Sequence, residues 1–239
     1  MLGVMFDTEL YMAETIITLS EEANWKVRTL LRTNRFYDKG EILNLYKTRV
    51  LGYIEYRTAT IYHCAENLLH QLDAVQQRVC NAVNVTSEEA LLSYNLAPLI
   101  ARRDMAMLGL IHRTVIGLGP EQFKKYFVIM QTPGRPEGRE ALRRHDKQLR
   151  SYRKGKFLQI VSHSIFGLVD IYNLLPEYTV MAPTVKIFQH RLQEQMISAV
   201  MMGMTDWSTM YSPRKPIFCH VLRTWQKWEG TGISPDWLK

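Results

Sequence analysis

The strongest constraint on the fold is the recurrence of apolar residues every three or four positions along much of the chain. The recurrence is nearly strict in the series Leu68, Leu72, Val75, Val79 and Val83. Such spacing places apolar side chains on one face of an α-helix. That face must be covered by neighbouring elements, so the sequence predicts a mainly α fold built as a helical bundle.

Two earlier segments have the same periodicity. Apolar positions recur from Ile16 to Leu31, and a second series runs from about Glu41 to His63. Three helices with short connections predict a three-helix bundle over residues 13–84. The opening of the chain suits the end of a strand instead, so we expect residues 1–12 to hold at most a short β remnant.

The helical pattern continues beyond this bundle. A helical extension is expected over residues 85–130, where Thr86 caps a short helix and Pro98 opens a long one. Two shorter apolar series predict a second, C-terminal helical region over residues 157–239, which ends in a tail rich in tryptophan.

The positive charge of the chain is concentrated in one segment. The 239 residues carry a net charge of +7, and residues 135–156 alone hold nine basic against three acidic side chains. Turn residues and weak periodicity predict a mobile basic linker over residues 131–156. A basic surplus favours a polyanionic partner such as nucleic acid, and a solvated linker without a partner is the alternative.

Arginines also line the first predicted helix. Arg28, Arg32 and Arg35 follow one another at helical spacing and are expected to stack on one face beside the apolar stripe. They suit contacts to a phosphate backbone, although a solubilising helix edge has the same pattern. Further phosphate contacts are predicted at the basic side chains of the linker: Arg143, Arg144, Lys147, Arg150, Arg153, Lys154 and Lys156.

Two other polar features suit structural roles better. The pair Arg102 and Arg103 is expected to anchor its helix through ion pairs rather than to bind phosphate. His112 lies on the apolar side of the same helix and is expected to be a core histidine with its hydrogen bonds satisfied.

The sequence contains no recognisable catalytic motif. It has no Gly-rich phosphate loop, no Gly-x-Ser-x-Gly and no His-Glu-x-x-His, and its eight aspartates are scattered singly. Two-metal chemistry needs clustered carboxylates. We therefore expect no catalytic residue, no metal site and no cofactor in this chain.

Cysteine content and hydropathy indicate a compartment. The three cysteines, Cys64, Cys80 and Cys219, are too few and too scattered for a disulfide framework, which indicates an intracellular location in the nucleus or cytoplasm. No uncharged apolar run is long enough for a transmembrane helix, so no membrane partner is expected.

A series of short motifs occurs along the chain in a recognisable order. They are LGV-x-x-D at Leu2–Asp7, LYK-x-x-V-x-x-x-I-x-Y at Leu45–Tyr56, LD-x-x-Q-x-R at Leu72–Arg78, P-L-x-x-R-R at Pro98–Arg103, YN-x-LP at Tyr172–Pro176 and F-x-x-x-L at Phe188–Leu192. Together they resemble the C-terminal part of the reverse transcriptases of non-LTR (LINE-type) retrotransposons. The chain departs from that family at Asn95–Leu96, where a glycine-containing form is usual, and at Tyr172, which replaces a tryptophan.

The resemblance covers roughly residues 1–195 and implies a function. It implies the end of the palm, a thumb domain and a C-terminal region of an RNA-directed DNA polymerase that acts in transposition and holds an RNA/DNA template–primer duplex. The catalytic palm, with its magnesium ions, and the fingers would lie upstream, so these residues would bind nucleic acid without catalysis. A free-standing helical protein-interaction module, and a decayed relic that would expose apolar surface and aggregate, are the alternatives.

Overall fold

The protein is mainly α-helical. The computed structural model describes residues 4–130, 145–152 and 158–223, and these residues contain many helices and no β-strand. The expected fold class is therefore confirmed. The chain divides into two compact units, Met1–Arg103 and Asp104–Lys239. The boundary falls inside one long helix, α7 (Leu99–Val115), which belongs to the segment expected as a single helical extension.

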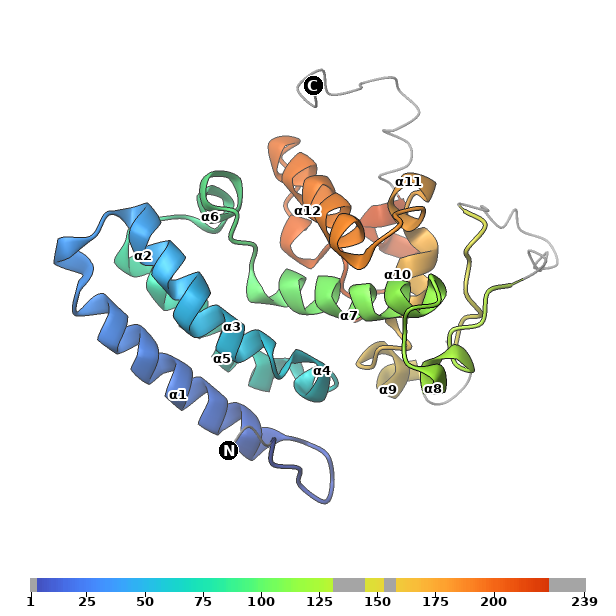
Figure 1. The fold of residues 1–239 in the computed structure, drawn as a ribbon, viewed down its shortest axis with the longest axis horizontal. Coiled ribbons are helices and arrows are strands. Elements are labelled where there is room, and N and C mark those ends of the chain that lie inside the picture. The colour runs from blue at the N-terminus through green and yellow to red at the C-terminus, as the bar shows by residue number, and fades with distance from the viewer. Residues whose placement is uncertain (1–3, 131–144, 153–157, 224–239) are drawn as a thin grey trace. The chain divides into compact units, whose positions relative to one another are not determined.

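Unit 1 is built from long helices joined by short turns. Its elements, in order, are α1 (Ala13–Leu31), the 3₁₀ turn η1 (Asn34–Phe36), α2 (Lys39–Tyr46), the π-helical turn η2 (Lys47–Leu51), α3 (Gly52–Glu55), α4 (Thr58–Ile61), α5 (Glu66–Ala82) and α6 (Ser87–Tyr94). The first residues of α7 follow them. The α2–η2–α3 segment forms one nearly continuous rod (Figure 1).

The core of unit 1 lies between α1, this rod and α5. Helix α1 packs against both α5 and the rod, and α2 also contacts α5. Fully buried side chains from each helix fill the space between them, among them Ile16, Tyr46, Ile54 and Leu72. The apolar stripes of the three segments therefore cover one another, which removes their surface from water.

Local capping explains why two helices of unit 1 begin where they do. The Asp38 carboxylate accepts from the Glu41 backbone N–H at 2.7 Å, and the Glu41 carboxylate accepts from the Asp38 backbone N–H at 2.9 Å. This reciprocal pair is a capping box. Thr86 caps α6 in the same position, since its hydroxyl accepts from the Glu89 backbone N–H at 3.1 Å. The expected start of this helix is confirmed.

The helix expected from Glu41 to His63 is not continuous. A π-helical turn interrupts it at η2, where the Thr48 hydroxyl donates to the Asn44 backbone carbonyl at 3.0 Å. Arg57 then leaves helical geometry, with φ −96° and ψ 1°, before α4 begins. Apolar spacing does not detect such breaks, because the residues on both sides keep facing the core.

The expected strand remnant at the start of the chain is absent from the described residues. The segment forms a turn instead, in which the two Asp7 carboxylate oxygens accept from the backbone N–H groups of Tyr11 at 2.8 Å and Met12 at 2.6 Å. A lone strand has no partner for its backbone groups. Here the Asp7 side chain accepts hydrogen bonds from two backbone N–H groups that would otherwise have no partner in the turn.

Unit 2 comprises the rest of α7 and a set of shorter helices around α12. Its other elements are α8 (Glu121–Lys124), α9 (Leu158–Ser162), α10 (Leu168–Leu174), α11 (Glu177–Val180), α12 (Val185–Met201), η4 (Trp207–Thr209) and η5 (Ile217–Cys219). Side chains of α12 pack directly on the α7 backbone at Gly109, where an added Cβ would lie 2.6 Å from the side-chain amide nitrogen of Gln189. Gly117, at φ +83°, follows the end of α7, where the left-handed conformation that glycine adopts without strain ends the helix.

Part of the predicted mobile linker is held in place. Within residues 145–152, the fully buried Leu149 exchanges two backbone hydrogen bonds with the Asn173 side chain of α10, at 2.7 and 2.8 Å. His145 is also buried, and its Nε2 bonds the Tyr172 carbonyl at 3.1 Å. The expectation of a mobile linker is therefore wrong for these residues, because one apolar side chain and one amide attach them to α10.

Candidate nucleic-acid interface

The outward face of α1 carries two of the predicted phosphate-binding arginines. Arg28 and Arg32 are exposed, whereas α1 buries residues such as Ile16 and Ala23. Because each residue turns about 100° around a helix, positions 28 and 32 fall on the side opposite this buried stripe rather than beside it. In the part of the chain that the structure describes, neither guanidinium group has a carboxylate partner. Both are available to an external anion.

Arg35 does not continue this helical face. Helix α1 ends at Leu31, and Arg35 lies in η1, so the expected stack of three arginines on one helix is wrong. Its guanidinium carbon lies 4.6 Å from the centre of the Phe36 ring, a cation–π arrangement. Arg35 is exposed and, like the other two, makes no ion pair among the described residues.

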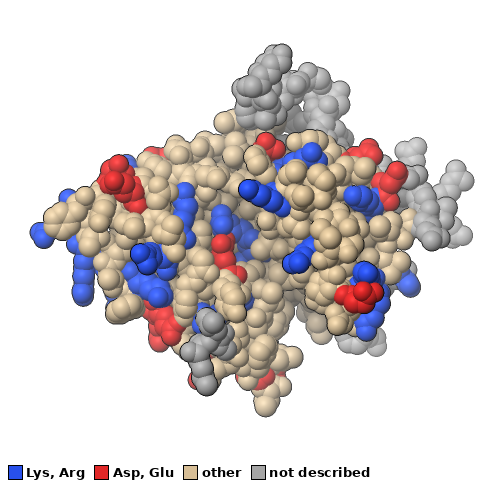
Figure 2. Space-filling model, in the orientation of Figure 1, with Lys and Arg blue, Asp and Glu red and all other residues tan. Residues whose placement is uncertain are grey.

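Packing adds two cations that the sequence analysis missed. Arg78 of α5 donates to the Asn24 side-chain oxygen of α1, one helical turn before Arg28. Lys39, at the start of α2, donates to the Asn84 backbone carbonyl at 3.1 Å. We call the set Arg28, Arg32, Arg35, Lys39 and Arg78 the basic end of unit 1. Figure 2 shows Lys and Arg side chains at the left of the view, with some Asp and Glu side chains among them.

A second group of cations surrounds one tyrosine of the α2–α3 rod. Lys26 and Arg57 lie 4.9 and 4.5 Å from the centre of the Tyr53 ring. Arg49 precedes Tyr53 by four residues and is exposed. Of the tyrosines in this segment, Tyr46 and Tyr62 are buried, Tyr53 is half-buried and Tyr56 is exposed.

Most of the predicted linker contacts lie outside the described residues. These are Arg143, Arg144, Arg153, Lys154 and Lys156. Of the remaining two, Lys147 is half-buried and its ammonium group donates to the Val180 carbonyl at 3.3 Å. Arg150 has an exposed side chain, while its backbone N–H donates to the Val128 carbonyl at 3.1 Å. Both belong to unit 2, whereas the α1 arginines belong to unit 1.

Arg102 and Arg103 are engaged in ion pairs within unit 1, as expected. Arg103 is buried and binds Asp73 of α5 through two parallel hydrogen bonds of 2.7 and 3.0 Å. Arg102 donates from Nε to the Glu55 carboxylate of α3 at 2.5 Å. The two pairs tie the start of α7 to the rod and to α5. These charges are therefore satisfied internally and carry no phosphate site.

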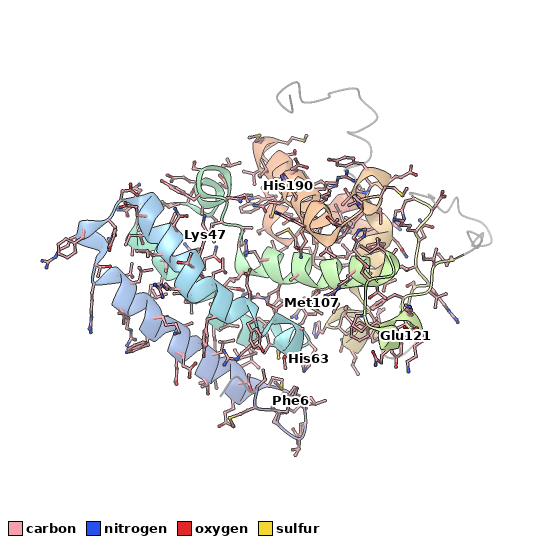
Figure 3. The ribbon with its side chains drawn as sticks, in the orientation of Figure 1. Phe6, Lys47, His63, Met107, Glu121 and His190 are labelled. Atoms are coloured by element: carbon pink, nitrogen blue, oxygen red, sulfur yellow. The ribbon has the colours of Figure 1, made fainter. Side chains whose placement is uncertain are left out.

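Neighbouring residues extend this polar network. The Lys47 ammonium group, labelled in Figure 3, donates to the Tyr94 carbonyl at the end of α6 at 2.5 Å. Burial, followed by the nearby Arg102 charge, lowers the pKa of Lys47. The Gln76 amide of α5 donates to the Ala97 carbonyl at 3.1 Å. Side chains from three of the quoted motifs thus connect the helices of unit 1 instead of facing solvent.

His112 belongs to the core of unit 2, as expected. Its Nε2 bonds the Ala182 carbonyl at 2.9 Å, and its Nδ1 lies 3.0 Å from the Tyr172 hydroxyl. The ring stacks on Phe188 with a centroid distance of 4.1 Å. Burial lowers the pKa of His112 to about 4. A neutral imidazole with both nitrogens engaged is a structural group.

Comparisons of this chain with known protein families, with curated proteins and with solved structures gave no match. Among the described residues, no group of three or more His, Cys, Asp or Glu side chains is arranged to hold a metal ion. In the same residues, no helix is both long and apolar enough to cross a membrane.

Proposed function

We propose that the chain is the thumb and C-terminal part of a LINE-type reverse transcriptase and that it binds an RNA/DNA template–primer duplex through backbone contacts, without catalysis of its own. The chain would work inside the cell, in the nucleus or cytoplasm. The palm and fingers of the same polymerase would be its partners, and the magnesium ions would be bound by the palm.

The observation that carries the proposal is that Arg28, Arg32 and Arg35 are exposed and pair with no carboxylate in the described part of the chain. Exposed surface ion pairs contribute little to stability, so unpaired arginines on a helix are retained at little structural cost. Phosphate binding uses guanidinium groups directly, because their planar donors match phosphate oxygens. The order of the motifs supports the assignment to a polymerase.

Salt dependence tests the electrostatic part of the proposal. Fluorescence anisotropy with a labelled RNA/DNA hybrid would measure the dissociation constant of the full chain over a range of salt concentrations. If about six charges contact phosphates, the logarithm of the affinity falls against that of the salt with a slope of roughly −5. A salt-independent affinity contradicts the proposal.

Charge reversal tests the residues. The triple variant Arg28→Glu, Arg32→Glu and Arg35→Glu is expected to bind the hybrid about tenfold or more weakly. The matched control is Lys125→Glu, Lys186→Glu and Arg223→Glu, which changes the net charge equally at exposed sites of unit 2. Equal losses in both variants would mean that only net charge matters, and the assigned surface would be wrong.

The upstream reading frame tests the polymerase assignment separately. Sequencing of the transcript before the Met1 codon is expected to show the same frame continuing into a palm with an Asp-Asp turn. Stop codons in that frame would contradict the assignment and leave binding alone to be explained.

A protein-interaction module is the second candidate. Met5, Phe6, Leu10 and Tyr11 favour it, because these large apolar side chains are all more than half exposed within one short segment. The arginine reversal separates the candidates, since the partner of an apolar surface would still bind the triple variant.

A further inference from the structure

An exposed tryptophan accompanies the free arginines of α1. Trp25 is 67% exposed and precedes Arg28 by three residues and Arg32 by seven. Residues at these spacings share one side of a helix. The indole ring has no aromatic or cation–π partner among the residues that the structure describes. Its π-face is therefore open next to two unpaired guanidinium groups.

The charge along this face changes sign at Trp25. Glu21 lies one turn before Trp25 and is exposed, and Glu14 lies further towards the start of the helix. The N-terminal half of the outward face is acidic, whereas the C-terminal half is basic. A phosphate backbone held by the arginines would be repelled beyond Trp25. Trp25 thus stands at the limit of the phosphate-binding surface.

The spacing suits one short piece of nucleic acid strand. Arg28 and Arg32 are separated by about 6 Å along the helix axis, and Trp25 lies about 4.5 Å before Arg28. Arginines that contact phosphates next to an aromatic ring that stacks a base are the usual elements of single-strand recognition. A base inside a duplex is stacked on both sides, so only an unpaired or terminal base can present a face to the ring.

We propose that this face binds an unpaired stretch of nucleic acid, with one base stacked on Trp25 and the adjoining phosphates on Arg28 and Arg32. The inference rests on the proposed nucleic-acid binding and adds the form of the ligand. It requires a preference for single strands, or for duplexes with a single-stranded overhang, over blunt duplexes.

The test uses the full chain with three labelled probes that share one sequence. They are a single-stranded RNA of about 12 nucleotides, within the usual site size, the blunt RNA/DNA hybrid, and the hybrid with an overhang. Trp25→Ala is expected to weaken binding of the single strand and the overhang probe about fivefold or more, the loss expected for one stacked base. Binding of the blunt hybrid should remain unchanged. Trp25→Phe, which keeps an aromatic face, should retain most of the affinity.

A matched aromatic control separates stacking from a general surface effect. Tyr11 is also 67% exposed but lies at the acidic end of α1, near Glu9 and Glu14. Tyr11→Ala is expected to bind all three probes like the unchanged protein. Circular dichroism would verify that each variant keeps its helical content, as expected for exposed positions.

Salt titration separates failure of this inference from failure of the proposed function. Arg28→Ala should make the single-strand slope shallower by about 0.7, whereas Trp25→Ala should leave the slope unchanged because stacking releases no counterion. Loss of affinity in Arg28→Ala with full affinity in Trp25→Ala would overturn the stacking role alone. Full affinity in both variants would overturn both proposals. If Trp25→Ala loses as much affinity for the blunt hybrid as for the single strand, the preference for unpaired bases would be overturned.

Discussion

Unit 1 contains two groups of arginines that differ in whether they form ion pairs. Arg102 and Arg103, at the start of α7, each meet a carboxylate from another helix, at 2.5 Å and at 2.7 Å respectively. Arg28 and Arg32, near the end of α1, meet none among the described residues and face solvent. Both groups look alike in sequence, as closely spaced arginines on an amphipathic helix.

The difference lies in what the neighbouring helices supply. Arg103 lies over α5 at the position of Asp73, and the pair is buried enough for loss of one partner to leave the other charge poorly solvated. Arg28 and Arg32, on the outward face of α1, are exposed in the described structure and therefore stay hydrated and available. Clustered arginines therefore indicate an anion site only where packing leaves them without carboxylates.

The largest effect on stability is expected when the ion pair between Arg103 and Asp73 is broken. Arg103→Ala should lower the free energy of unfolding by about 3 kcal/mol, because it leaves the partly buried Asp73 carboxylate without its guanidinium partner and with only the exposed His70 ring, 3.3 Å away, beside it among the described residues. Urea denaturation followed by circular dichroism would measure the loss. Asp73→Asn provides a second variant that removes the charge pair while keeping the volume. A loss for both variants as small as that of a surface substitution would contradict a structural role for the pair.

A smaller effect concerns His112, which is satisfied internally like Arg103. Its folded-state pKa of about 4 lies below the ordinary value of 6.5, so below pH 6.5 the unfolded chain binds a proton that the folded chain does not. The stability contribution is therefore present above pH 6.5 and is lost as the pH falls towards 4. Between pH 7.5 and 5 the loss should be about 2 kcal/mol.

Urea denaturation at both pH values would measure this loss. The comparison is with His112→Phe, which removes the titrating group but keeps a ring beside Phe188. The same pH dependence in both proteins would assign the loss to other groups.

The smallest effect on stability is expected from substitution of Arg28 or Arg32. Arg28→Ala and Arg32→Ala should each change the free energy of unfolding by less than about 0.5 kcal/mol, because both side chains are exposed and neither forms an ion pair with a described residue. Each should nevertheless make the salt dependence of hybrid-duplex binding shallower by about 0.9. The same denaturation and anisotropy measurements apply. A large loss of stability would mean that these arginines are structural like Arg103.

Local rules predicted a good part of the fold and of the polar residues. The stripe from Ile16 to Leu31 predicted α1, and Thr86 marked the start of α6, because periodicity and capping depend on residues a few positions apart. The internal roles of Arg102 and His112 followed from their positions on an amphipathic helix. The π-helical turn at η2 and the break at Arg57 could not be predicted in this way, because apolar spacing does not report a local irregularity of the backbone.

The candidate interface was only partly predictable. Arg28 and Arg32 were found from their spacing, but the end of α1 at Leu31 removed Arg35 from their face. Arg78 was missed because its place beside α1 comes from the packing of α5, 54 residues away in sequence from its partner Asn24. Leu149 likewise lies in a polar segment, and only its contact with Asn173 of α10 shows that the segment is attached.

The sequence by itself determined that the chain is helical, about where several helices of residues 13–115 begin, and which side of them is apolar. The reason is that helix formation and capping act over a few neighbouring residues. Only the tertiary structure decided which charges are free. Arg102 and Arg103 find their carboxylates 47 and 30 residues away, distances over which the sequence carries no pattern. Arg28 and Arg32, in contrast, pair with no carboxylate among the residues that the structure describes. The free cations and the exposed Trp25 of that face are what remain for a partner.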